Sequence, residues 1–205
     1  MTMIRRVLLS AAATVAAAGP AWAHHGMDDA TPQTLAQGFL SGLAHPVIGP
    51  DHLAFVIGIG ILAAFASGGW ILPAVFLGMG AIGTAIHLTG ISLPASKILV
   101  GLTVLLMAGA VLMRRQAPPA LLVALCGLGG LAHGYALAES IVGAEPTPLS
   151  SYLAGLVVIQ LAISLAVREG VVRMVGWRPL VADRALVAAS GLMLVAGSMA
   201  LILPS

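Results

Sequence analysis

Six long apolar segments dominate the chain after residue 34. They cover roughly residues 35–66, 70–89, 97–113, 119–138, 150–167 and 185–203. About 20 consecutive apolar residues are enough for a helix to cross the ~30 Å hydrocarbon core of a bilayer. The third and fifth segments are shorter, and we expect them to extend into their loops. The pattern predicts an all-α integral membrane protein with six transmembrane helices, forming one domain over residues 35–205.

The first 23 residues have the order of parts of a secretory signal peptide. A basic pair, Arg5 and Arg6, precedes an apolar run over 7–19, and an A-x-A cleavage site follows at 21–23. The run is shorter than the ~20 residues that a spanning helix needs. We therefore expect residues 1–23 to be removed, with an uncleaved anchor helix as the alternative.

Cleavage would leave a short extracytoplasmic arm over residues 24–34. The arm would begin with His24 and His25, and two aspartates follow closely. A new α-amine beside two imidazoles has the donor groups to capture a metal ion such as Ni²⁺. An ordinary polar N-terminus is the equally supported alternative.

Composition excludes several classes of protein. Of the 205 residues, 60% are apolar or aromatic and only 8% are charged, whereas soluble domains contain ~25% charged residues. A soluble domain could not cover its surface with so few charges, so soluble, disordered and nucleic-acid-binding proteins are excluded. The single cysteine, Cys126, excludes a disulfide framework and cysteine-based zinc or iron–sulfur sites. Membrane lipid is thus an expected partner and nucleic acid is not.

After the N-terminal segment, the arginines cluster in two predicted loops. Arg114 and Arg115 follow the third apolar segment, and the loop after the fifth contains four more: Arg168, Arg173, Arg178 and Arg184. Cytoplasmic loops are enriched in Lys and Arg. The distribution predicts a multi-pass protein of the bacterial cytoplasmic (inner) membrane whose mature termini are both extracytoplasmic. The arginines are also expected to contact anionic lipid.

A concentrated set of ionisable side chains interrupts the apolar segments. Such a group costs about 2.5–3.5 kcal/mol in a bilayer on insertion scales, so it indicates function by default. The set comprises His45, Asp51, His52, His87, His133 and Glu139. Packing against a neighbour is the alternative role for His87 and His133, and a position at the membrane edge is the alternative for Glu139.

The stretch from His45 to His52 predicts a broken helix. In an unbroken helix, residues seven apart lie about 10.5 Å apart along the axis, too far to share a metal ion with bonds of about 2.0–2.1 Å. Three helix-breaking residues lie between them: Pro46, Gly49 and Pro50. A break would allow His45 to fold back toward Asp51 and His52, and transporters use such breaks as binding sites. The alternative is a kinked helix in which His and Asp simply pair.

This stretch resembles the HupE/UreJ family of nickel and cobalt permeases, whose members carry H-P-x-x-G-x-D-H in the first span. Every fixed position is matched: His45, Pro46, Gly49, Asp51 and His52. A looser family element in the fourth span is similar to His133-Gly134 followed by Glu139, although many members have another histidine where this chain has Leu137 and Ala138. The resemblance implies six spans after a signal peptide, an external N-terminus and metal transport rather than enzyme activity.

The donor atoms fit a divalent transition metal. Imidazole suits Ni²⁺, Co²⁺ and Zn²⁺, whereas Cu(I) prefers sulfur ligands. We predict that His45, Asp51, His52, His133 and Glu139 bind a transported ion, with His87 as a further ligand or a residue on its path. The transported substrate would be nickel or cobalt, and no resident cofactor is expected. The sequence does not exclude an oligomer. The two rival hypotheses are a membrane haem protein with paired axial histidines and an intramembrane hydrolase, for which no nucleophile or metalloprotease motif is present.

Overall fold

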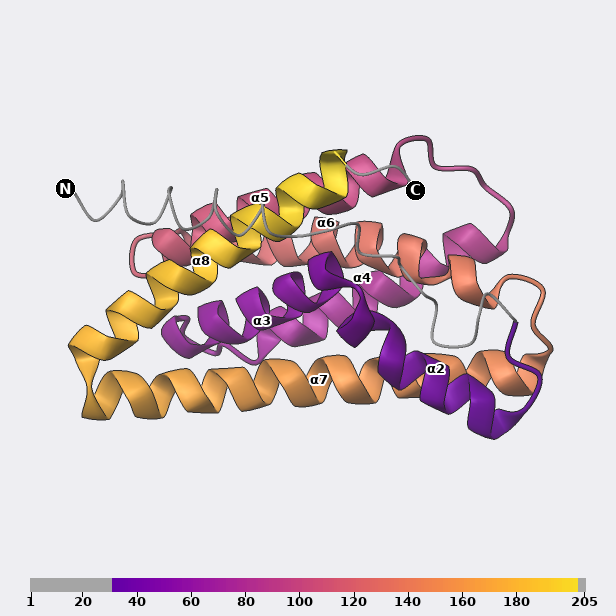
Figure 1. Ribbon diagram of the computed structural model, residues 1–205, viewed down its shortest axis with the longest axis horizontal. Coiled ribbons are helices and arrows are strands. Elements are labelled where there is room, and N and C mark those ends of the chain that lie inside the picture. The colour runs from indigo at the N-terminus through magenta and orange to yellow at the C-terminus, as the bar shows by residue number, and fades with distance from the viewer. Residues whose placement is uncertain (1–30, 203–205) are drawn as a thin grey trace.

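The protein is all-helical over the part of the chain that its structure, a computed structural model, describes. Residues 31–202 are described, and they contain seven α-helices and one 3₁₀ helix but no strand (Figure 1). The prediction of an all-α fold is therefore confirmed. The predicted signal peptide and the pair His24 and His25 lie outside the described residues.

The helices up to residue 137 follow the predicted segments to within a few residues, whereas the last two helices are longer than predicted. Their bounds in chain order are α2 Leu35–Ile48, α3 Pro50–Phe65, α4 Ile71–Leu88, α5 Ser96–Leu112, α6 Pro119–Leu137, the 3₁₀ helix η1 Glu139–Ile141, α7 Pro146–Trp177 and α8 Pro179–Ile202. Within residues 31–202, four helical stretches are long and apolar enough to cross a membrane, and the pair α2 and α3 adds a fifth if it is one broken span. Helix α5 is apolar but shorter, so the count of six stays a prediction.

The first predicted span is broken where the sequence indicates. Helices α2 and α3 meet at an angle of 82°, and Gly49 at the junction is in an extended conformation. Pro46 lies in the last part of α2, and Pro50 is the first residue of α3, where its missing N–H costs nothing. At its other end, α2 begins with a capping box between Thr34 and Gln37.

The predicted loop after the fifth span is wrong. Helix α7 continues from Pro146 to Trp177, and α8 begins at Pro179, so only Arg178 lies between the two helices. Arg168 and Arg173 belong to α7, and Arg184 belongs to α8. No proline interrupts residues 149–177, and Glu169 and Arg173 form an ion pair one turn apart that suits a helix. The charged residues from Arg168 onward therefore indicate where the apolar segment ends, but helix α7 continues past them to Trp177.

Close contacts between parallel helices organise the bundle. Helix α2 runs parallel to the first half of α7 (Figure 1), where Gly38 and Gly42 lie against the backbone of Pro148 and Tyr152. Helices α4 and α6 are also parallel, and Gly134 of α6 lies directly on the backbone of α4. Small residues allow such approach and are a common basis of helix association in membranes.

An apolar core lies between α3 and its neighbours. Its most deeply buried side chains include Phe55, Ile59, Leu62, Val104 and Met107. Large apolar side chains also cover the outside, among them Leu40, Leu106, Leu128 and Leu192. Helices that are apolar all round are typical of a protein surrounded by lipid.

Candidate metal centre

Two histidines from distant parts of the sequence are in direct contact inside the bundle. His52 lies in the first turn of α3, and His133 lies toward the C-terminal end of α6. Their Nδ1 atoms are hydrogen-bonded at 2.8 Å, and their ring centroids are 4.9 Å apart. Both side chains are buried. The fold thus joins the motif in the first span to the element in the fourth.

Two phenyl rings and one hydroxyl group lie next to the His133 imidazole. The ring of Phe55 lies 4.5 Å from the His133 ring, and the ring of Phe76 lies 6.2 Å away. On the other nitrogen, Nε2 of His133 lies 3.1 Å from the Thr103 hydroxyl of α5. Side chains from α3, α4 and α5 therefore fix the position of this imidazole.

His45 lies at the end of α2 and contacts a second group of hydroxyls. Its Nδ1 atom lies 3.0 Å from Oγ of Ser140 in η1 and 3.1 Å from the Tyr152 hydroxyl of α7. Its ring centroid is 6.1 Å from that of His52, with the rings nearly perpendicular at 81°. The break between α2 and α3 thus brings these two imidazoles close together.

Asp51 occupies the start of α3. Its Oδ1 atom accepts a hydrogen bond from the backbone N–H of His52 at 2.8 Å, and its side chain is half-buried. The N-terminus of a helix has a partial positive charge, which stabilises a carboxylate. Asp51 thus lies in the first turn of the helix that begins after the predicted break.

The predicted site residues therefore divide into two groups. His45, Asp51, His52 and His133 lie around the break, whereas Glu139 is exposed in η1 and His87 lies elsewhere on α4. Within residues 31–202, no three side chains of His, Cys, Asp or Glu are arranged so that they could hold a metal ion. The three imidazoles of the first group form a row. The ring of His45 lies beside that of His52, and His52 is hydrogen-bonded to His133.

His87 packs against an aromatic ring. Its ring centroid lies 4.3 Å from that of Tyr135 in α6, and its Nδ1 atom is buried without a hydrogen-bond partner in the described part of the chain. The hydroxyl of Tyr135 donates to the carbonyl of Ile91 and accepts from the N–H of Leu93. Tyr135 thereby attaches the connection between α4 and α5 to α6.

Three hydroxyl-bearing residues near the histidines were absent from the sequence-based set. Thr103, Ser140 and Tyr152 contact His133 or His45, but none is ionisable near neutral pH. A signal did exist, because Thr103 and Tyr152 are polar residues within predicted apolar spans. A search for every polar side chain in the spans, rather than for ionisable ones, would have included them.

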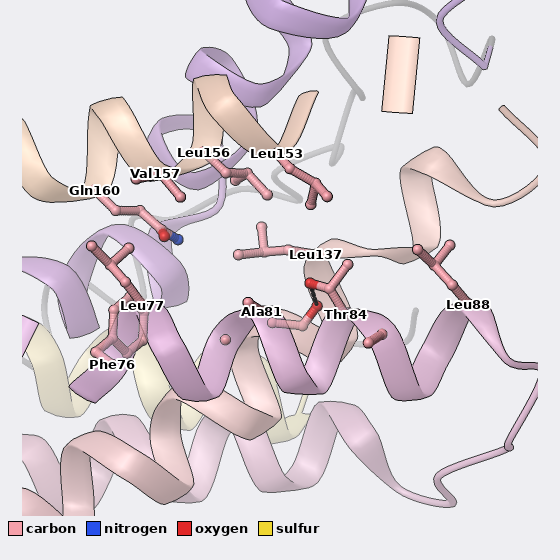
Figure 2. A pocket seen from close by; sticks show the side chains of 13 residues that line it. Phe76, Leu77, Ala81, Thr84, Leu88, Leu137, Leu153, Leu156, Val157 and Gln160 are labelled. Atoms are coloured by element: carbon pink, nitrogen blue, oxygen red, sulfur yellow. Dashed lines mark hydrogen bonds between the residues drawn. The ribbon is translucent and has the colours of Figure 1, made fainter. Parts of the chain in front are cut away.

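A groove lies beside this cluster, between α4, α6 and α7. It encloses about 170 Å³ and is mostly apolar. Figure 2 shows the amide of Gln160 pointing into it, and the Thr84 hydroxyl bonded to the carbonyl of Gly134 at its wall. Phe76 lines the groove, and its ring also lies beside the imidazole of His133. The groove therefore adjoins the histidines without containing them.

Comparison with known proteins assigns the family. The family described as HupE / UreJ protein matches residues 12–201, which is nearly the whole chain. The chain belongs to the HupE/UreJ family. A curated member, Protein HupE of Rhizobium leguminosarum bv. viciae, is 31% identical over 102 residues, covering 49% of this chain and 53% of the relative. This chain thus matches about half the length of that HupE protein. No solved structure shows a significant match.

Proposed function

We propose that this chain is a permease that carries nickel or cobalt ions into the cytoplasm. The observation that carries the proposal is the approach of His45 and His52 at a helix break inside a membrane protein, with Asp51 bonded to the backbone amide of His52. The HupE/UreJ family is associated with nickel and cobalt transport, which agrees with this chemistry.

Each residue at the break supplies a donor suited to a divalent transition metal. The imidazoles of His45 and His52 favour Ni²⁺ and Co²⁺ over the hard ions Mg²⁺ and Ca²⁺. The carboxylate of Asp51 supplies a negative charge that offsets part of the cost of moving the ion out of water. His133 is proposed to support His52 through their hydrogen bond, and the exposed position of Glu139 suits the recruitment of ions at the membrane edge.

The membrane potential is sufficient to drive such uptake. A single charge gains about 2.3 kcal/mol on crossing 100 mV, so a divalent ion gains about 4.6 kcal/mol. Since a tenfold concentration ratio corresponds to ~1.4 kcal/mol, this energy supports accumulation over more than three decades. No second substrate is required.

The haem alternative finds less support in the geometry. Two axial histidines must face each other across an iron atom and its porphyrin, but His52 and His133 are hydrogen-bonded directly to each other. A Soret band in the purified protein would nevertheless favour haem binding over ion transport.

Uptake measurements test the proposed function. Cells that produce the chain are expected to accumulate ⁶³Ni or ⁵⁷Co faster than cells with an empty vector, and a protonophore should reduce the difference by collapsing the membrane potential. Immunoblots of membrane fractions establish that the protein is present. The proposal would be contradicted if the protein is present in the membrane but the two strains accumulate the same amount of nickel and the same amount of cobalt.

The proposed orientation places both ends of the mature chain outside the cytoplasm. Arginines gather at the ends of α5 and α7, with Arg114 and Arg115 near the first and Arg178 after the second, and such residues favour the cytoplasmic side. Alkaline phosphatase fused after Ser205 should therefore be active. Green fluorescent protein fused at the same position should be dark when the general secretory route exports it. A fluorescent fusion would overturn this orientation.

A further inference from the structure

The hydroxyl of Thr103 lies between a carbonyl group of its own helix and one ring nitrogen of His133. Thr103 donates its only proton to the carbonyl of Val100, at 2.7 Å. Toward Nε2 of His133, 3.1 Å away, the hydroxyl oxygen is therefore the acceptor. Nε2 of His133 must then be the donor. In a neutral imidazole, only one nitrogen is protonated, so Nδ1 of His133 is an acceptor.

That assignment passes through the histidine pair to His52. The two Nδ1 atoms are 2.8 Å apart, and a hydrogen bond between them requires one proton. Because Nδ1 of His133 is the acceptor, Nδ1 of His52 is the donor. A neutral His52 then has its lone pair on Nε2, and a neutral imidazole nitrogen is what a transition metal binds.

A separate group of hydroxyls has the same effect on His45. The Tyr152 hydroxyl donates to the carbonyl of Leu137, and Ser140 donates either to that carbonyl or to the Tyr152 oxygen. When the two hydroxyl protons take these positions, both oxygens act as acceptors toward Nδ1 of His45. Nδ1 of His45 is then the donor, and Nε2 has the lone pair.

We propose that Thr103 and the pair Ser140 and Tyr152 are positioning residues that hold His52 and His45 in the tautomer that presents Nε2 to the transported ion. This inference rests on the proposed function and adds residues to its site. Histidines that bind metals generally donate their other ring N–H to a fixed acceptor, which sets the tautomer and the ring orientation. Here the acceptors come from α5, α6, η1 and α7, outside the motif over residues 45–52.

The spacing of the two rings is compatible with one shared ion. Imidazoles that bind the same ion at about 2.0–2.1 Å have ring centroids about 4.5–6.4 Å apart, depending on the angle at the metal. The centroids of His45 and His52 are 6.1 Å apart. The closer pair, His52 and His133, is linked through its Nδ1 atoms, so those two nitrogens are used by each other rather than by an ion.

Nitrogen-15 spectroscopy of the full-length chain tests the tautomers directly. With ¹⁵N-labelled histidine in reconstituted membranes, the resonances of His45 and His52, assigned by single substitutions, should report protonated Nδ1 and unprotonated Nε2, and His133 should show the opposite. In Thr103→Val, which replaces the hydroxyl by a methyl group of similar shape, the His133 and His52 signals should change. The reverse tautomer at His52 in the parental chain would overturn the inference.

Transport kinetics test the consequence. Thr103→Val and Tyr152→Phe are each expected to raise the KM for ⁶³Ni uptake about 10–100-fold, the usual effect of removing a group that orients a metal ligand. Thr103→Ser retains the hydroxyl and should keep the parental KM, which a purely packing role for the threonine would not explain. A parental KM in Thr103→Val would contradict the inference. Absence of uptake by the parental chain would contradict the proposed function instead, while the spectra would still report the tautomers.

Discussion

Cells that produce the Asp51→Asn variant are expected to take up nickel or cobalt at least about tenfold more slowly than cells with the parental chain. The substitution keeps the size of the side chain and an oxygen that can accept the hydrogen bond from the His52 amide. It removes the negative charge that would offset a divalent ion in the membrane. Even residues that only orient a ligand typically change metal affinity ~10–100-fold, so the loss of Asp51 as a proposed ligand should have an effect at least as large. Initial rates over a range of ion concentrations measure the effect.

Two further variants make this experiment specific. His52→Ala should reduce uptake as strongly as Asp51→Asn. His87→Ala also removes an imidazole from a membrane helix. Its effect should be milder, because the His87 ring packs against Tyr135 and not against the histidines at the break. Immunoblots of membrane fractions control for the amount of protein. If Asp51→Asn and His52→Ala reach the membrane and transport with parental rate and affinity, the motif is a structural kink.

The Gly134→Ala variant is expected to lose about 1–3 kcal/mol of stability or to fail to accumulate. A Cβ atom at this position would overlap the carbonyl group and Cα of Gly80, and backbone atoms cannot move aside as a flexible side chain can. Helices α4 and α6 would have to separate, with a loss of packing that is typical of overfilled interiors. The midpoint of thermal unfolding in detergent is the measurement.

Gly127→Ala is the matched control on the same helix. Gly127 lies two turns earlier on the same face of α6, but its Cβ would meet Val75 and Met79 at 3.6 and 3.8 Å, which is ordinary contact. Alanine is the better helix former by about 0.8–1.0 kcal/mol, so this variant should be as stable as the parental chain or slightly more so. Equal midpoints for the two variants would show that the contact at Gly134 is not required.

The sequence was sufficient to predict the elements and the break between them. The lengths of the apolar segments predicted the helices, because a chain in lipid must satisfy its backbone hydrogen bonds within each span. Pro46 and Pro50 gave the break, because proline cannot continue the backbone pattern of the preceding helix. The extent of α7 was not predicted, since the residues around Arg173 are polar enough for a loop but contain no proline that would end the helix.

Helix partners and the groups around the histidines were not predictable in this way. Helices that are apolar on all sides do not indicate which side faces a neighbour, so the parallel contacts of α2 with α7 and of α4 with α6 depend on the whole packing. Thr103 illustrates the second difficulty. Its hydroxyl bonds to Val100 in its own helix, as threonines in helices commonly do, and only the fold places His133 beside it.

The hydrogen bond between Asp51 and the amide of His52 bears on the state of a carrier after its cargo has left. A carboxylate that loses its cation inside a membrane is costly, and a carrier with so unfavourable an unloaded form would return only with another ion bound. In this protein, the amide of His52 and the positive end of α3 stabilise the carboxylate of Asp51 by themselves. For a permease of the proposed kind, the unloaded form is thus an ordinary stage of the cycle. We would expect such a carrier to accumulate its ion and not to require a one-for-one exchange of ions across the membrane.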